Sequence, residues 1–247
     1  MTAPAYQLYE PLGQLKPVAD DVWIVDGPEI RFRYYLLRIP FPTRMTVVRL
    51  PAGAMWIHSP VPLTDELARA ITRIGPVSHL VAPNTIHYWW VGEWKRRFPD
   101  AQVWAVSRLD PGAKERMPPH TVLNSEPPRE WNGVINQVIV EGTRLMEADF
   151  FHRPSRTLVI TDMIENFETS RVHSRFYRWL FRLGGVIDPD GMTPSDLRSG
   201  FAKQRNQLRD AVKQMIAWQP ERLIIAHGRW YPCNAVAELQ RAFRWVL

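Results

Sequence analysis

The segment 55–106 alternates short apolar runs with helical patterns, and it limits the fold more than any other part of the chain. A first helical pattern begins after Thr64, a typical N-cap residue, and a second spans residues 89–98. Strands that alternate with helices in this way lie parallel, with their C-terminal ends at one edge of a sheet. Three apolar runs supply the expected strands: Met55–Ile57, Val77–Val81 and Ala101–Val106.

The residues before this segment predict an antiparallel meander of three strands. The first, Val22–Asp26, is expected to end at Gly27-Pro28. The other two, Ile30–Ile39 and Met45–Leu50, are expected to be joined by a turn at Pro40-Phe41-Pro42-Thr43. Residues 1–19 contain three prolines and predict an extended N-terminal arm.

The second half of the chain repeats the mixture of strands and helices, so we expect one α/β domain over residues 1–247. A divergent section at about 166–200, rich in basic and aromatic residues, predicts a helical insertion or lid. On either side of this section, apolar runs predict strands at 131–141, 144–151, 156–162 and 222–228. Helical patterns predict helices at 201–218 and 234–246.

Polar side chains of the kinds that bind metals or transfer protons follow four of the apolar runs. Ligands collect at the C-terminal ends of strands in α/β proteins, so we expect these side chains to share one site. Asn84 belongs to the same loop as the second of them and is a candidate for substrate binding. The four are His58, His87, Asp162 and His227.

Composition excludes several other classes of protein. The single cysteine, Cys233, excludes an intrachain disulfide and a cysteine-built zinc cluster. The net charge of +6 comes without any zinc-finger, basic-zipper or RNA-binding signature, so we expect no specific nucleic-acid partner. No signal peptide is visible, and no run approaches the roughly 18 apolar residues of a membrane span. The expectation is a cytoplasmic protein.

The endings Thr161-Asp162 and Ala226-His227-Gly228, in this order of elements, resemble the metallo-β-lactamase-like superfamily. The resemblance covers about residues 22–247. It is strongest to a poorly characterised branch, a domain of unknown function found in bacteria and photosynthetic organisms. It implies a four-layer αββα sandwich with a dinuclear metal site at one edge.

The superfamily's first metal motif, Thr-His-x-His-x-Asp-His, corresponds here to residues 82–88. Pro83 and Thr85 occupy the two leading histidine positions, and His87 falls at or beside the aspartate position. Thr143 lies near the position of the next histidine, with Glu147 and Asp149 a little further along. The resemblance matches Asp162 to the bridging aspartate and His227 to the terminal histidine. It places His58 where many members carry an aspartate.

The resemblance therefore implies a reduced, mononuclear metal site of His87, Asp162 and His227. Two histidines and a carboxylate suit catalytic zinc, the expected ion ahead of iron or manganese. His87 and Asp162 would then be catalytic, and His58 would be a further ligand or a general base. The function implied is that of a metal-dependent hydrolase acting on a small molecule. The alternative is a metal-free, inactive descendant that binds a small ligand or a protein.

Two further features bear on ligands and partners. Trp230, just after His227, is expected to join Asn84 in binding the substrate. Residues 174–185 combine three arginines with apolar residues at helical spacing. We expect them to form a lid or a core helix, and contact with an anionic membrane is the less favoured alternative. The sequence does not indicate an oligomeric state.

Overall fold

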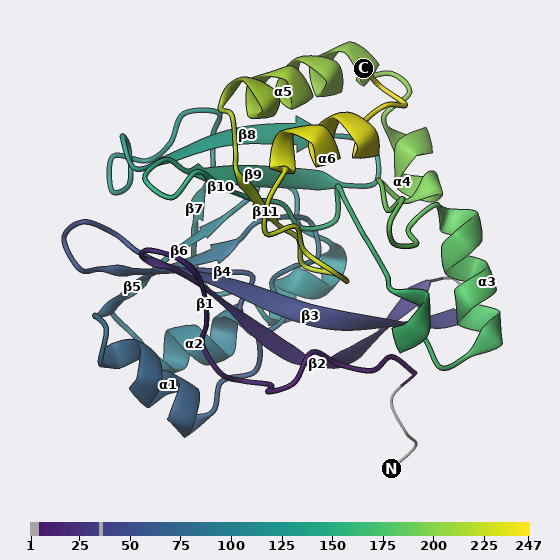
Figure 1. The fold of residues 1–247 in the computed structure, drawn as a ribbon. Helices are drawn as coiled ribbons and strands as arrows, with labels where there is room; N and C mark the ends of the chain where they lie inside the picture. The colour runs from purple at the N-terminus through teal and green to yellow at the C-terminus, as the bar shows by residue number, and fades with distance from the viewer. Residues whose placement is uncertain (1–4, 35–36) are drawn as a thin grey trace.

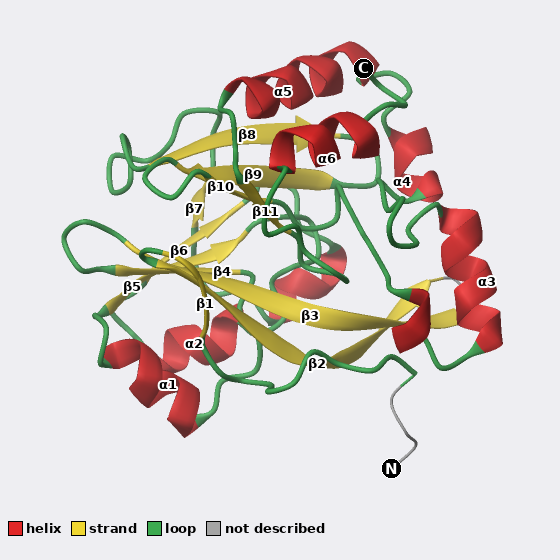
Figure 2. Ribbon diagram, viewed as in Figure 1, coloured by secondary structure: helices red, strands yellow, loops and turns green. Residues whose placement is uncertain are grey.

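A computed structural model of the protein describes residues 5–34 and 37–247, and its centre consists of two β-sheets packed face to face (Figures 1 and 2). The larger sheet contains, in sheet order, β1 (Lys16–Ala19), β2 (Val22–Tyr34), β3 (Leu37–Arg49), β4 (Met55–His58), β5 (Val77–Ala82), β6 (Gln102–Ala105) and β7 (Thr121–Val122). The smaller sheet contains, in sheet order, β11 (Arg222–Ile224), β10 (Thr157–Val159), β9 (Met146–His152) and β8 (Ile135–Glu141).

Helices cover the outer face of each sheet, which gives the four-layer αββα arrangement expected from the sequence (Figure 1). The larger sheet is covered by α1 (Asp65–Thr72) and α2 (Val91–Arg97), and the smaller sheet by α5 (Arg205–Ala217) and α6 (Ala235–Ala242). The expected insertion contributes α3 (Arg175–Gly184) and α4 (Ser195–Gly200), and two 3-10 helices lie at Pro111–Glu115 and Thr169–Arg171. Among the described residues, no helix has both the length and the apolarity needed to cross a bilayer.

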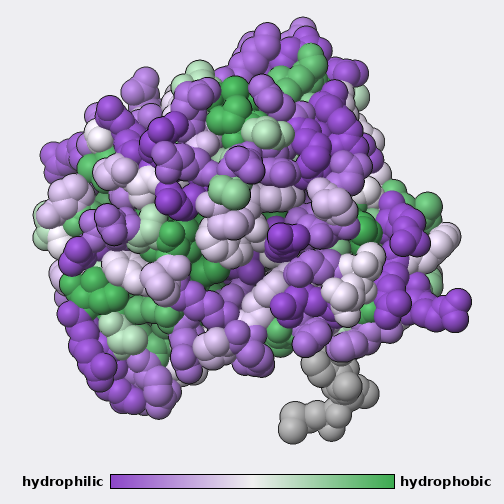
Figure 3. Space-filling model, in the orientation of Figure 1, coloured by the Kyte–Doolittle hydropathy of each residue, from purple (hydrophilic) through white to green (hydrophobic). Residues whose placement is uncertain are grey.

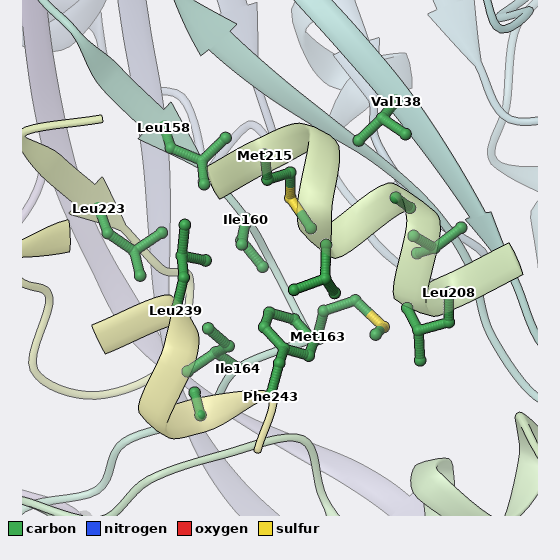
Figure 4. Packing of buried hydrophobic residues seen from close by; sticks show 14 of the residues in the cluster. Val138, Leu158, Ile160, Met163, Ile164, Leu208, Met215, Leu223, Leu239 and Phe243 are labelled. Carbon is green, nitrogen blue, oxygen red and sulfur yellow. The ribbon is translucent and has the colours of Figure 1, made fainter. Parts of the chain in front are cut away.

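Three apolar layers hold the sheets and helices together. Between the sheets, Trp56 of β4 and Phe150 of β9 pack edge to face with their ring centroids 5.0 Å apart. A second layer lies between the larger sheet and α1 and α2. In the third, Met215 of α5 and Leu239 of α6 pack on the smaller sheet (Figure 4). The face of the molecule shown in Figure 3 is correspondingly mostly hydrophilic.

The segment 55–106 folds as the sequence predicts. Strands β4, β5 and β6 pair in parallel, and His58 at the end of β4 is in register with Val81 of β5. The side chain of Thr64 caps α1 by accepting a hydrogen bond from the backbone N–H of Leu67 at 3.2 Å. The C-terminal ends of these strands therefore face one edge of the sheet. The strands β1 to β4 form an antiparallel meander, but not from the three expected strands. Strand β1 lies in the expected N-terminal arm, and the expected strand Ile30–Ile39 is divided between β2 and β3.

The two predicted interruptions of the meander are wrong. Strand β2 continues through Gly27-Pro28 with only a register shift, and β3 continues through Pro40–Thr43. Proline lacks the N–H that a strand donates, so it is tolerated where a strand edge has no neighbour. Strand β4 pairs only with residues 46–49 of β3, which leaves that edge without a partner strand at both prolines. The result is a long hairpin that reaches past the sheet to α3 (Figure 1).

Candidate metal centre

Three of the four predicted side chains meet at the edge where the two sheets come together. His87 Nε2 lies 3.1 Å from His227 Nε2. The Oδ1 atom of Asp162 lies 3.3 Å from the first of these nitrogens and 3.0 Å from the second. Each residue follows the end of a different strand: β5, β10 and β11. Two imidazole nitrogens and one carboxylate oxygen thus converge on one point.

The loop of His227 is held in place by a buried arginine. Arg44 of β3 donates hydrogen bonds from Nη1 to the carbonyls of Ile225 and Gly228, both at 2.8 Å, and it pairs with Asp26. Gly228 has φ of +93°, and a Cβ atom there would lie 2.0 Å from the carbonyl oxygen of Asn166. Only glycine fits this close approach. The His-Gly pair seen in the sequence therefore has a backbone reason.

The unpaired edge of β3 fixes the ring of His227. Its Nδ1 lies 2.7 Å from the carbonyl oxygen of Pro42, which can only accept a hydrogen bond. The Nδ1 atom is therefore protonated, and the lone pair of a neutral ring lies on Nε2, which faces Asp162. The proline-containing stretch mistaken for a turn thus supplies an orienting contact of the site.

The loop of His87 is shaped by Asn84. The side-chain oxygen of Asn84 accepts hydrogen bonds from the backbone N–H groups of Ile86 and His87, both at 2.9 Å. The hydroxyl of Ser59, the residue after β4, lies 2.7 Å from His87 Nδ1. This contact orients the second imidazole as Pro42 orients the first, again leaving Nε2 toward the convergence point.

A buried carboxylate on the neighbouring strand positions Asp162. Glu147 of β9 accepts hydrogen bonds from the backbone N–H groups of Thr161 and Asp162, both at 2.8 Å. Asn84 Nδ2 donates to Glu147 Oε2 at 2.9 Å and to Asp162 Oδ2 at 2.7 Å. One oxygen of Asp162 is therefore occupied by Asn84, and the other faces the two histidines.

The contact of Asp162 with His87 and His227 determines the pKa shifts in the cluster. Burial disfavours the charge of Asp162, but His87 and His227 outweigh it and hold the pKa of Asp162 well below its usual range. Burial also lowers the pKa of His87, yet the charge and hydrogen bond of Asp162 reverse the effect, so the pKa of His87 is raised. The cluster therefore stabilises a positive charge beside an ionised carboxylate.

The arrangement fits a single metal ion. A tetrahedral ion with bonds of about 2.1 Å places its ligand atoms roughly 3.4 Å apart, close to the separations of 3.0 to 3.3 Å found here. Both histidines carry an orienting partner on the other ring nitrogen, as metal ligands do. Within the described part of the chain, His87, Asp162 and His227 are the group of side chains close enough together to hold a metal.

The three residues form the floor of a cavity of about 570 Å³. Its walls come from the β2–β3 hairpin, from the loop after β5 and from α3, and most of the lining side chains are hydrophobic. Glu165 also lines the cavity. Burial, and then the charge of Asp162, raises the pKa of Glu165 well above the value of a free glutamate. Burial therefore favours the protonated form of Glu165.

His58 does not join the cluster. It is 2% exposed and stacks on Trp56 at 5.4 Å between the sheets, with Phe150 packed against its ring at 5.5 Å. Its Nε2 meets no hydrogen-bond partner among the described residues. Burial lowers the pKa of His58 to about 3, so the ring is neutral. The structure gives His58 a place in the core and gives its neighbour Ser59 the contact with His87.

The two residues expected to bind substrate lie away from the cavity lining. Asn84 is fully buried, and its polar atoms are used within the protein. Trp230 is partly buried and packs against the core clusters of the smaller sheet. Sequence reasoning assigned no role to Ser59 or Glu165, and it noted Glu147 only for its position. The available signals were that Ser59 directly follows His58 and that Glu165 comes three residues after Asp162.

Comparison with known proteins gives a consistent structural picture. A model of a domain of unknown function (DUF4336) matches residues 20–109, which include His58 and His87. No curated protein sequence matches the chain.

Solved structures similar to this one are metallo-β-lactamases. The DIM-1 enzyme, solved after exposure to ceftazidime, is 13% identical with a TM-score of 0.62, over 93% of this chain and 94% of that chain. An enzyme from Hirschia baltica is 13% identical with a TM-score of 0.59, over 92% and 95% of the two chains. The FIM-1 enzyme from Pseudomonas aeruginosa, in its mono-zinc form, is 12% identical with a TM-score of 0.59, over 95% and 96%.

Identities this low carry information about the fold and not about the substrate. The matched regions span nearly the whole of both chains, and the αββα layers agree with the resemblance in the sequence. The protein has the metallo-β-lactamase fold, with a group of two histidines and one aspartate at the edge of its sandwich that could hold a metal ion.

Proposed function

We propose that the protein is a metal-dependent hydrolase with a mononuclear centre. The observation that carries the proposal is the convergence of His87 Nε2, His227 Nε2 and Asp162 Oδ1 at the floor of a cavity. His87, His227 and Asp162 would hold the ion, and zinc suits this donor set best. When bound, zinc supplies Lewis-acid polarisation of a carbonyl and lowers the pKa of a water molecule toward about 7.

Asn84 favours one ion over two. Its Nδ2 lies within 2.9 Å of Glu147 Oε2 and of Thr161 Oγ1, and 2.7 Å from Asp162 Oδ2. The amide nitrogen thus lies among these three oxygens and donates to the Asp162 oxygen that does not face the histidines. The motif positions held by Pro83 and Thr85 offer no imidazole for a second ion either.

The remaining residues of the site have roles that follow from their contacts. Pro42 and Ser59 orient the two imidazoles, and Glu147 holds the loop of Asp162. Glu165 lines the cavity, and burial raises the pKa of its carboxyl group, which favours the proton-carrying form and makes Glu165 the candidate donor to a leaving group.

Hydrolysis assays of the zinc-loaded protein on activated esters, thioesters and lactones test the proposal. We expect turnover that a chelator abolishes and that added zinc restores. Asp162→Ala should lose at least a hundredfold in kcat/KM, whereas Asp210→Ala, at an exposed position of α5, should match the wild type. Zinc binding without turnover of any substrate class would contradict the hydrolase. Absence of zinc binding would support the metal-free binding module instead.

A further inference from the structure

Most side chains in the walls of the cavity are hydrophobic, and the charged side chains of Arg33, Arg144, Glu165 and Asp196 also belong to its lining. The β2–β3 hairpin contributes Ile30 and Ile39, the loop after β5 contributes Trp89 and Trp90, and α3 contributes Leu180. The polar ligands of the candidate metal centre lie together at the floor. A cavity of about 570 Å³ accommodates a ligand of many non-hydrogen atoms. The hydrophobic majority of the lining therefore suits a ligand with a large apolar part.

The apolar lining continues to the outer surface. Leu37 of the hairpin and Leu183 of α3 both line the cavity, and they are 36% and 59% exposed. The Tyr177 hydroxyl of α3 donates to the carbonyl of Arg38 at 3.0 Å, which joins the helix to the hairpin beside this opening. Large exposed hydrophobic side chains around a cavity mark a binding site for apolar groups. The entrance is therefore suited to a hydrocarbon chain.

We propose that the substrate is a carboxylic ester or thioester with a long hydrocarbon acyl chain. The inference rests on the hydrolase proposed above and names its substrate class. The chain lies between the hairpin and α3, and the scissile carbonyl lies at His87, Asp162 and His227. In the reaction, the oxygen of water bonds to the carbonyl carbon and the C–O or C–S bond breaks. The leaving alcohol or thiol takes up a proton, and a fatty acid is released.

A series of substrates with one leaving group and increasing chain length tests the inference. We expect KM of the zinc-loaded protein for p-nitrophenyl esters to fall about two- to fourfold for each added methylene between acetate and octanoate, because each one leaves water for the cavity. Acyl thioesters of matched length should follow the same trend. A KM that is independent of chain length, or that rises with it, would overturn the inference.

Binding of cis-parinaric acid to the metal-free protein separates this inference from the proposed hydrolase. We expect saturable fluorescence enhancement that does not require zinc. If the probe binds but no ester is hydrolysed, the result supports an acyl-chain-binding cavity and contradicts the proposed hydrolase activity. If acetate and octanoate esters are hydrolysed alike and the probe does not bind, the hydrolase stands and the long-chain substrate is refuted.

Matched variants locate the chain. Leu180→Gln places an amide in the cavity wall, and we expect at least tenfold weaker probe binding and a higher KM for the octanoate ester only. Phe176→Gln, on the same helix at a 48% exposed position outside the lining, should change both values less than twofold. Ile39→Gln tests the opposite wall in a separate element, should Leu180→Gln fail to fold. If Leu180→Gln and Ile39→Gln bound the probe and the octanoate ester as well as Phe176→Gln does, the acyl chain would not lie between the hairpin and α3.

Discussion

The hydroxyl of Ser59 controls which nitrogen of His87 can bind a metal. It contacts Nδ1 at 2.7 Å and leaves Nε2 to face Asp162 and His227. Removing an orienting partner of this kind weakens metal binding by about 10- to 100-fold. Ser59→Ala should therefore weaken zinc binding by that factor in a competition titration with a chromophoric chelator. Ser170→Ala, at an exposed position, is the matched control, and equal affinities of the two variants would refute the role of Ser59.

The buried carboxyl group of Asp149 makes the stability of the folded protein depend on pH. Burial, and then the charge of Glu147 and a hydrogen bond with it, raise the pKa of Asp149 well above the usual value. The folded protein holds this proton, whereas the unfolded chain releases it above about pH 4. The stability provided by the neutral group is full below that pH and is lost as pH rises toward the folded-state pKa.

Asp149→Asn should remove this loss because an amide stays neutral at every pH. We expect thermal unfolding at pH 4 to match the wild type and Tm at pH 8 to rise by several degrees. The control is Asp210→Asn, an exposed aspartate whose replacement should leave Tm unchanged at both pH values. If Asp149→Asn raised Tm at pH 4 as much as at pH 8, the protonation of Asp149 would not be the cause of the stabilisation.

At the scale of elements, strand β9 links the two sheets through Glu147. This carboxylate accepts three backbone N–H groups of residues 161–163 and the amide of Asn84 in the loop after β5. Glu147→Gln would turn one acceptor into a donor facing other donors. We expect a loss of about 2–4 kcal/mol in the free energy of unfolding by urea.

Glu141→Gln on the adjacent strand β8 is the control for this prediction. Glu141 is exposed and lies 3.8 Å from Arg108, so its replacement should change stability by less than about 0.5 kcal/mol. If Glu147→Gln and Glu141→Gln lost similar amounts of unfolding free energy, the hydrogen bonds of Glu147 would not be what holds the strand ends together.

The elements also show what the sequence can predict. The β4–β6 block followed from its alternation of apolar runs and helical patterns, because local periodicity determines such units. The long hairpin did not follow, because the prolines of β3 are acceptable only where β4 has ended, and that pairing is not local. His87, Asp162 and His227 were found through strand ends and resemblance. Glu147 and Ser59 act through contacts between distant segments, which no spacing indicates.

At the scale of the whole molecule, the fold brings three separate strand ends to the edge between the sheets. The hairpin and α3 extend from that edge and wall a cavity over it. The helices and sheets of a metallo-β-lactamase fold are present, while the two leading histidine positions of the metal motif are filled by Pro83 and Thr85. We therefore expect one metal ion per chain, bound by His87, Asp162 and His227.

The metal content of the purified protein tests this claim most directly. The protein is loaded with excess zinc, dialysed and measured by mass spectrometry of the elements, beside His227→Ala and the control His173→Ala, at an exposed position. We expect about one zinc per chain for the wild type and the control, and little or none for His227→Ala. A wild-type protein without zinc, or a His227→Ala variant that retains zinc in full, would rule out this mononuclear site.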